Sequence, residues 1–250
     1  MSGNFSLTTF NSKGKLKQIE NALTAVKNGE TSVGIVFKDG VVLATEKQYK
    51  SPLVDTDSVK KIQQISEHVG ATYSGLFGDF RVLLQHTRKS TVKYNMTYQE
   101  PRLMGNLARE TAKTFQEFTQ SGGVRPFGIS LLMAGADKSG VHLFQLDPSG
   151  VYQEWKATAT GSNGADCRAF FEKRYKDQMS EEEAVHLALL AIKRGFEGAF
   201  KSQNVEVALV QKFEIDKNQE MEGLDALENQ WKFNTLSHDQ IEEYMSFIQE

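Results

Sequence analysis

Residues 32–45 have the sequence SVGIVFKDGVVLAT. Two short apolar runs, Ser32–Phe37 and Val41–Thr45, flank the pair Asp39-Gly40. Asp-Gly between two such runs is a strong signal for a tight turn that joins paired strands. The stretch therefore predicts a β-hairpin, and a hairpin requires an antiparallel sheet.

Further strand-like and helical segments extend from this hairpin in both directions. Upstream, apolar residues recur at three- and four-residue steps and predict a helix that ends at Gly29. Downstream, strand-like runs cover 69–74, 128–134, 141–145, 151–156, 205–210 and 231–234. Helical periodicity covers 79–94, 103–118 and 166–175, and two more helices open with capping boxes at Ser180 and Ser237.

This order of segments predicts an α+β fold. Strand runs joined by hairpin turns form antiparallel sheets, and helices grouped in pairs pack as layers on the outer faces of those sheets. Two segments lie outside the pattern. Residues 1–13 are polar and predict an extended tail, and residues 212–230 are polar and acidic and predict a surface insertion.

The composition excludes several classes of function. The net charge of −3 provides no basic field for nucleic acid or acidic lipid. No apolar run approaches the ~18–20 residues of a membrane helix, and the first residues lack the apolar core of a secretory signal. The single cysteine excludes an intrachain disulfide. We expect a cytosolic protein, with access to the nucleus left open.

Candidate chemistry is sparse. The five histidines do not have the His-x-x-x-His spacing that places two metal ligands on one helical face, so no metal and no cofactor are expected. Cys167 lies near a helix start, but no base partner is suggested, and burial is the simpler interpretation. Lys60-Lys61 lies in a strand-like context; from the sequence pattern alone it is a surface pair.

Several motifs, in order along nearly the whole chain, match a known family. The strongest is FTQSGGVRPFG at residues 118–128. Others are SLTTF (6–10), SVGI (32–35), GVVLA (40–44), VKKI (59–62), YQEP (98–101), DPSG (147–150) and NVEV (204–207). With these motifs the chain resembles the alpha-type subunits of the 20S proteasome.

The resemblance implies a single domain over residues 1–250 with a four-layer αββα sandwich, the N-terminal-nucleophile hydrolase fold. It adds an N-terminal helix at about residues 14–28 and assigns residues 1–13 to a gate tail. It implies a seven-membered ring with other alpha-type subunits, stacked on beta-type subunits. The implied role is ubiquitin-dependent and ubiquitin-independent protein degradation in the cytoplasm and nucleus.

The resemblance also bears on catalysis. Active beta-type relatives use an N-terminal threonine whose own amine activates it. The matching position here falls near Glu30 or Thr31, in the middle of the chain, with Glu46 and Lys61 at the supporting aspartate and lysine positions. An amide nitrogen cannot act as that base, so a non-catalytic subunit is expected. The alternatives are a beta-type peptidase cleaved before Thr31 and a thiol enzyme that uses Cys167.

Two sets of site residues follow from the resemblance. The first is a pocket between neighbouring subunits that takes the C-terminal carboxylates of regulatory-particle ATPase tails. Its implied residues are Lys61, Leu16, Gly29, Gly75 and Leu76. The second set, at the gate, is Phe5, Ser12 and Asn21. Ser12 replaces the family's turn proline and Asn21 replaces its tyrosine, so a role for this tail in the open gate is in question.

Overall fold

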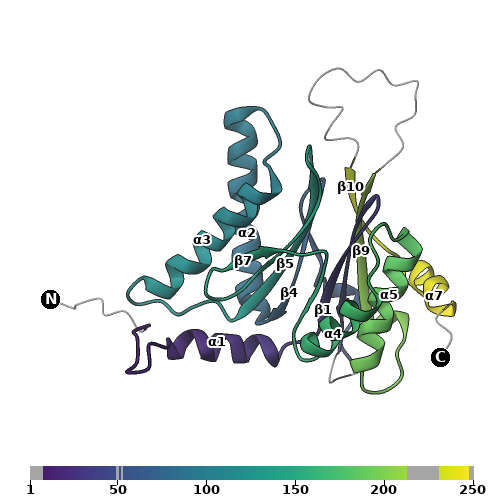
Figure 1. The fold of residues 1–250 in the computed structure, drawn as a ribbon, viewed down its shortest axis with the longest axis horizontal. Helices are drawn as coiled ribbons and strands as arrows, with labels where there is room; N and C mark the ends of the chain where they lie inside the picture. The colour runs from purple at the N-terminus through teal and green to yellow at the C-terminus, as the bar shows by residue number, and fades with distance from the viewer. Residues whose placement is uncertain (1–7, 49–50, 52, 213–230, 248–250) are drawn as a thin grey trace.

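The chain forms two stacked sheets between layers of helices (Figure 1). The structure is a computed structural model, and it describes residues 8–48, 51, 53–212 and 231–247. Within those residues each sheet has five strands, and helices cover both outer faces. The predicted four-layer αββα sandwich is confirmed.

The first sheet contains the hairpin predicted from residues 32–45. Its strand order is β10-β9-β2-β1-β8, and each neighbouring pair is antiparallel. The strands are β1 (Ser32–Phe37), β2 (Gly40–Glu46), β8 (Ala157–Thr160), β9 (Val205–Lys212) and β10 (Trp231–Thr235). Hairpin neighbours are therefore adjacent, while β9 and β8 enter from distant parts of the chain.

The second sheet is an antiparallel meander with the order β3-β4-β5-β6-β7. The strands are β3 (Gln63–Ser66), β4 (Val69–Gly75), β5 (Ile129–Asp137), β6 (Gly140–Leu146) and β7 (Tyr152–Glu154). Between the sheets lies an apolar layer that includes Leu43, Leu132 and Leu143. Each such side chain contributes roughly 1.5–3 kcal/mol on burial, so this layer holds the sheets together.

Helices complete the outer layers (Figure 1). They are α1 (Lys17–Lys27), α2 (Phe77–Tyr98), α3 (Met104–Gln120), α4 (Gly164–Arg174), α5 (Glu181–Gly195) and α7 (His238–Ser246), with short 3-10 turns η1 (Thr56–Ser58) and η2 (Ser202–Asn204). α2 and α3 pack on the second sheet, and α4, α5 and α7 pack on the first. α1 lies across one end of the second sheet, against β4 and β5.

Both predicted capping boxes are present. Ser180 accepts from the Glu183 amide and Ser237 accepts from the Gln240 amide, and each partner side chain accepts from the cap residue's own amide. These bonds satisfy amides that the first helical turn leaves without partners.

Some predicted boundaries are wrong. The hairpin loop is Lys38-Asp39, because Phe37 already pairs with Gly40. Gly40 belongs to β2, where a Cβ atom would come within 2.4 Å of the Val210 carbonyl on the neighbouring strand. Glycine at that position therefore allows the close approach of β9, and the turn needs no glycine.

Other differences concern the ends of elements. The N-terminal helix begins at Lys17, three residues later than predicted, because Gly14 has a φ of +69° and belongs to a turn. Pro101 precedes α3, whose first residue is Met104. The predicted run 151–156 is reduced to β7 at Tyr152–Glu154, and β8, which lies in the other sheet at Ala157–Thr160, was not predicted. β3 was not predicted as a strand. Of the acidic insertion 212–230, residues 213–230 lie outside the described residues.

Candidate functional site

The site residues gather at the open end of the β1–β2 hairpin. Pairing outward from Phe37 and Gly40 brings Ser32 opposite Thr45, and one step further Thr31 meets Glu46. The Glu46 amide donates to the Thr31 carbonyl at 2.9 Å. The two-residue loop therefore fixes the position of the threonine and its carboxylate neighbour, although they are 15 residues apart.

Thr31 is enclosed and its nitrogen is an amide. That nitrogen donates to Glu46 Oε2 at 3.3 Å, and the residue is only 1% exposed. Its hydroxyl lies 3.2 Å from Ser162 Oγ and accepts from the Asn163 amide at 3.3 Å. The threonine therefore has neither a free amine to activate it nor open space above its hydroxyl.

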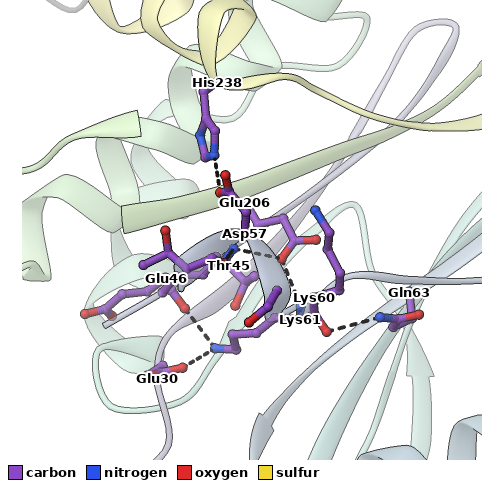
Figure 2. A network of polar contacts seen from close by, with 12 residues as sticks. Glu30, Thr45, Glu46, Asp57, Lys60, Lys61, Gln63, Glu206 and His238 are labelled. Atoms are coloured by element: carbon purple, nitrogen blue, oxygen red, sulfur yellow. Dashed lines mark hydrogen bonds and ion pairs between the residues drawn. The ribbon is translucent and has the colours of Figure 1, made fainter. Parts of the chain in front are cut away.

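Lys61 joins this group from the segment before β3 (Figure 2). Its Nζ atom lies 2.6 Å from Glu30 Oε2 and donates to the Glu46 carbonyl at 2.9 Å. The same nitrogen is 5.5 Å from the centre of the Tyr73 ring. The Lys61 side chain is 4% exposed, whereas that of Glu30 is 35% exposed. The lysine thus points inward, and the acid that neutralises it remains in contact with solvent.

Burial governs the protonation of this group. It lowers the pKa of Lys61, because a desolvated ammonium is disfavoured, and the nearby Glu30 carboxylate works against that change. Burial likewise raises the pKa of Glu46, and the bond from the Thr31 amide opposes the rise. Such shifts are as typical of buried ion pairs as of catalytic sites, and the enclosed Thr31 favours the former.

A second buried pair lies behind the first. Glu206 Oε2 accepts from the Lys61 amide at 2.9 Å and lies 4.0 Å from Lys47 Nζ, which donates to the Thr56 carbonyl at 2.8 Å. Burial raises the pKa of Glu206 and lowers that of Lys47. Sequence reasoning missed both residues. A charged residue within the apolar run 205–210 was the available signal, because lone charges are rare in buried strands.

Two of the predicted pocket glycines, Gly29 and Gly75, lie in direct contact with each other, and Gly29 is the neighbour of Glu30 in the chain. A Cβ atom on Gly29 would be 2.2 Å from the Gly75 nitrogen, and one on Gly75 would be 2.1 Å from the Gly128 carbonyl oxygen. Gly75 also has a φ of +118°, which side chains disfavour. Gly29 precedes Glu30 and Gly75 precedes the exposed Leu76. The structure therefore brings four of the five predicted pocket residues together.

Leu16 is the exception. It is the N-cap of α1, while Gly29 follows the other end of that helix. At 1.5 Å per residue the two positions are separated by about 20 Å. Within one chain Leu16 is therefore apart from the other four.

The strongest sequence motif, residues 118–128, supports this arrangement. Arg125 forms two bonds to the Asp79 carboxylate, at 2.7 and 2.8 Å, and the Gly128 amide donates to the same group at 2.8 Å. The Gly128 carbonyl in turn accepts from the Leu76 amide at 3.1 Å. The motif thus ties the first turn of α2 to the backbone that carries Gly75 and Leu76.

Two of the three predicted gate residues, Ser12 and Asn21, belong to the described residues. Phe5 lies outside the described residues. Ser12 is exposed in a turn in which the Asn11 side chain accepts from the amides of Lys13 and Lys15, each at 2.9 Å. Asn21 is exposed on α1. The turn therefore forms without a proline at residue 12, because Asn11 supplies the bonds.

Cys167, the other candidate nucleophile, is not placed for thiol chemistry. Cys167 is buried, its thiol donates to the Ala191 carbonyl at 3.3 Å, and burial raises its pKa to about 11. A thiol with that pKa is almost entirely protonated at neutral pH and is a poor nucleophile. In the described part of the chain there is no metal-binding cluster of histidine, cysteine and acidic residues. Nor is any helix in that part long and apolar enough to cross a membrane.

Comparison with known proteins identifies the family. A model of the family described as "Proteasome subunit" matches residues 26–210. This chain belongs to the proteasome subunit family. The match includes Thr31, Glu46, Lys61 and Glu206.

Curated relatives refine the resemblance to alpha-type proteasome subunits. "Proteasome subunit alpha type-2-A" of Arabidopsis thaliana is 53% identical over 82% of this chain and 88% of its own length. "Proteasome subunit alpha type-2" of Trypanosoma brucei brucei is 45% identical over 98% of both chains, and that of Dictyostelium discoideum is 48% identical over 96% of both. The predicted resemblance to alpha-type subunits is confirmed, and among them the motifs favour the second type, in agreement with these names.

Proposed function

We propose that this chain is a non-catalytic subunit of the alpha ring of the 20S proteasome. In that role it joins other alpha-type subunits in a seven-membered ring, stacks on beta-type subunits and contributes to the gate through which substrates pass. The cytoplasm and nucleus are the proposed locations. The names of the relatives and the fold support the assignment to the ring.

The observation that carries the non-catalytic part is the state of Thr31. An N-terminal-nucleophile peptidase needs a free amine next to its threonine hydroxyl. Here the nitrogen is an amide bonded to Glu46, and the residue is 1% exposed. Glu46 and Lys61 remain beside it, so what is missing is the amine and access to the hydroxyl.

Thr31→Ala tests this part directly. In the reconstituted particle, every peptidase specificity should keep its wild-type kcat/KM, and the intact mass of the wild-type chain should show that residues before Thr31 are retained. Loss of one specificity, or a mature chain that starts at Thr31, would favour the beta-type alternative.

Tail docking is the second part of the proposal. Lys61 supplies the ammonium that pairs with the C-terminal carboxylate of a regulatory-particle ATPase tail, with Gly29, Gly75 and Leu76 beside it. A charge-assisted bond of this kind contributes ~1.5–3 kcal/mol. The position of Leu16 at the far end of α1 fits a pocket completed across a subunit boundary.

Lys61→Met tests docking. Methionine fills a similar volume without the charge, and Glu30 is left at a position that water reaches. Rings should assemble, while carboxylate-dependent binding of a tail peptide at this subunit should fall by about tenfold or more. Binding equal to wild type would remove Lys61 from the docking role.

A further inference from the structure

The ammonium of Lys61 already has a carboxylate on it, supplied by its own chain. Glu30 Oε2 lies 2.6 Å from Nζ, which is the separation of a strong charge-assisted bond. Figure 2 shows the two side chains meeting end to end, and Glu30 comes from the residues just before β1. A C-terminal carboxylate arriving at Lys61 would need the position that Glu30 fills.

We infer that Glu30 is an internal competitor that must leave Lys61 before a tail carboxylate can bind this subunit. The inference rests on the docking role proposed above and concerns its regulation. The carboxylate of Glu30 stands in for the carboxylate of the tail, so the docked and undocked states exchange one acid for another on the same cation.

Only the acid is free to move. The Lys61 amine is bonded to the Glu46 carbonyl and lies over the Tyr73 ring, and its amide is bonded to Glu206. These contacts keep the cation in place whichever acid it faces. Glu30, by contrast, follows Gly29 in the short segment between α1 and β1. About a third of its side chain is already exposed to solvent. Rotation of that side chain into solvent breaks one ion pair and requires no change in the sheet.

The displaced acid continues to act on the tail. Glu30 is fixed to the backbone beside Gly29, so after rotation its charge remains near the bound carboxylate. Like charges in a partly buried site disfavour each other. Glu30 therefore weakens docking in two ways, by occupying the cation and by repelling its replacement. Removing its charge should strengthen docking rather than weaken it.

Glu30→Gln, assembled in the complete particle, tests the inference. The probe is a ten-residue peptide with the sequence of a regulatory ATPase C-terminus and a photoreactive residue near its free carboxylate. Labelling of this subunit is measured by mass spectrometry of the separated chains, and labelling of the other ring subunits is the internal control. Half-maximal labelling of this subunit should need about tenfold less peptide than in wild type, and an amidated peptide should show no such gain.

Glu20→Gln is the matched control. It removes one acid from the first turn of α1, where Glu20 pairs with Lys15 at 3.5 Å, and should leave labelling unchanged. Glu30→Asp provides a second variant, because it keeps the charge but withdraws the carboxylate by one methylene. It should give a smaller gain than Glu30→Gln.

The outcomes separate this inference from the docking proposal. If Lys61→Met abolishes carboxylate-dependent labelling while Glu30→Gln and Glu30→Asp label as wild type does, docking stands and the competitor role of Glu30 is refuted. If the Lys61→Met subunit is labelled as strongly as the wild-type subunit, the proposed docking at Lys61 is refuted, and the competitor role of Glu30 is refuted with it. A gain in Glu30→Gln that the amidated peptide shares would also refute competition, because it would not depend on the carboxylate.

Discussion

Lys61 and Lys47 are both buried, and each faces a glutamate, but the two glutamates differ in how much of the side chain is exposed to solvent. Lys61 meets Glu30 at 2.6 Å, and that acid is 35% exposed. Lys47 lies 4.0 Å from Glu206, and both side chains are nearly closed to solvent, at 3% and 6% exposed. The closed pair can only hold the fold together. The open pair can exchange its acid, and only an exchangeable partner leaves room for an external ligand.

The largest effect should come from breaking the closed pair. Glu206→Ala leaves Lys47 buried without its acid and removes the acceptor of the Lys61 amide. Removing one partner of a buried pair costs about 3–5 kcal/mol. Denaturant titration of the full chain measures the change in the free energy of unfolding. Glu206→Gln is the control, because its amide oxygen can still accept from Lys61, and its loss should be smaller.

Glu30→Ala should cost less, about 1–2 kcal/mol by the same titration. Exposed ion pairs contribute about 0–1 kcal/mol and closed ones more, and Glu30 lies between these cases. Water can also reach the position that its carboxylate leaves. A loss as large as that of Glu206→Ala would make the two pairs equivalent and Glu30 a fixed structural partner.

The third prediction concerns pH. Burial raises the pKa of Glu46 above the 4.5 of an exposed glutamate. A raised carboxyl pKa adds stability that is fully present below 4.5 and is lost as the pH rises through the folded value. Glu46→Gln keeps an oxygen that can accept from the Thr31 amide but does not ionise. Relative to wild type, its free energy of unfolding should therefore increase between about pH 4.5 and neutrality.

Paired measurements of wild type and Glu46→Gln at several pH values check this. Glu20→Gln, in the first turn of α1, controls for the loss of one carboxylate. A difference between wild type and Glu46→Gln that is constant across the range would show that burial does not govern this group.

Part of the candidate site could be predicted from the sequence. Residues 32–45 predict the hairpin. Its register, with Ser32 opposite Thr45, then places Thr31 beside Glu46. The resemblance identified Lys61 and the two glycines. Neither route gave Glu206, which meets Lys61 across 145 residues, because strand-to-strand contacts of that range leave no periodic trace. Glu30 was missed as a partner because one residue between a helix and a strand has no pattern of its own.

For the fold as well, local features could be predicted from the sequence and long-range pairings could not. Capping boxes and helical faces are local, so α5 and α7 were predicted from Ser180 and Ser237. The strand β8 was missed because only two residues separate it from the end of β7 and yet it belongs to the other sheet. Which sheet a short strand joins depends on tertiary packing rather than on its own residues.

The smallest effect should come from Lys60→Ala. Lys60 precedes Lys61 and carries the same charge, but it is exposed. Its backbone carbonyl accepts a hydrogen bond from the Gln63 side chain (Figure 2), and this bond does not involve the lysine charge. An exposed charge of this kind changes stability by less than about 0.5 kcal/mol. Labelling by the carboxylate peptide should equal wild type, because the proposed docking depends on a cation fixed by Glu46 and Tyr73 rather than on the sum of nearby charge. A loss in Lys60→Ala as large as in Lys61→Met would mean that the site attracts tails by its general field, and the distinction between fixed and exposed lysines would no longer explain it.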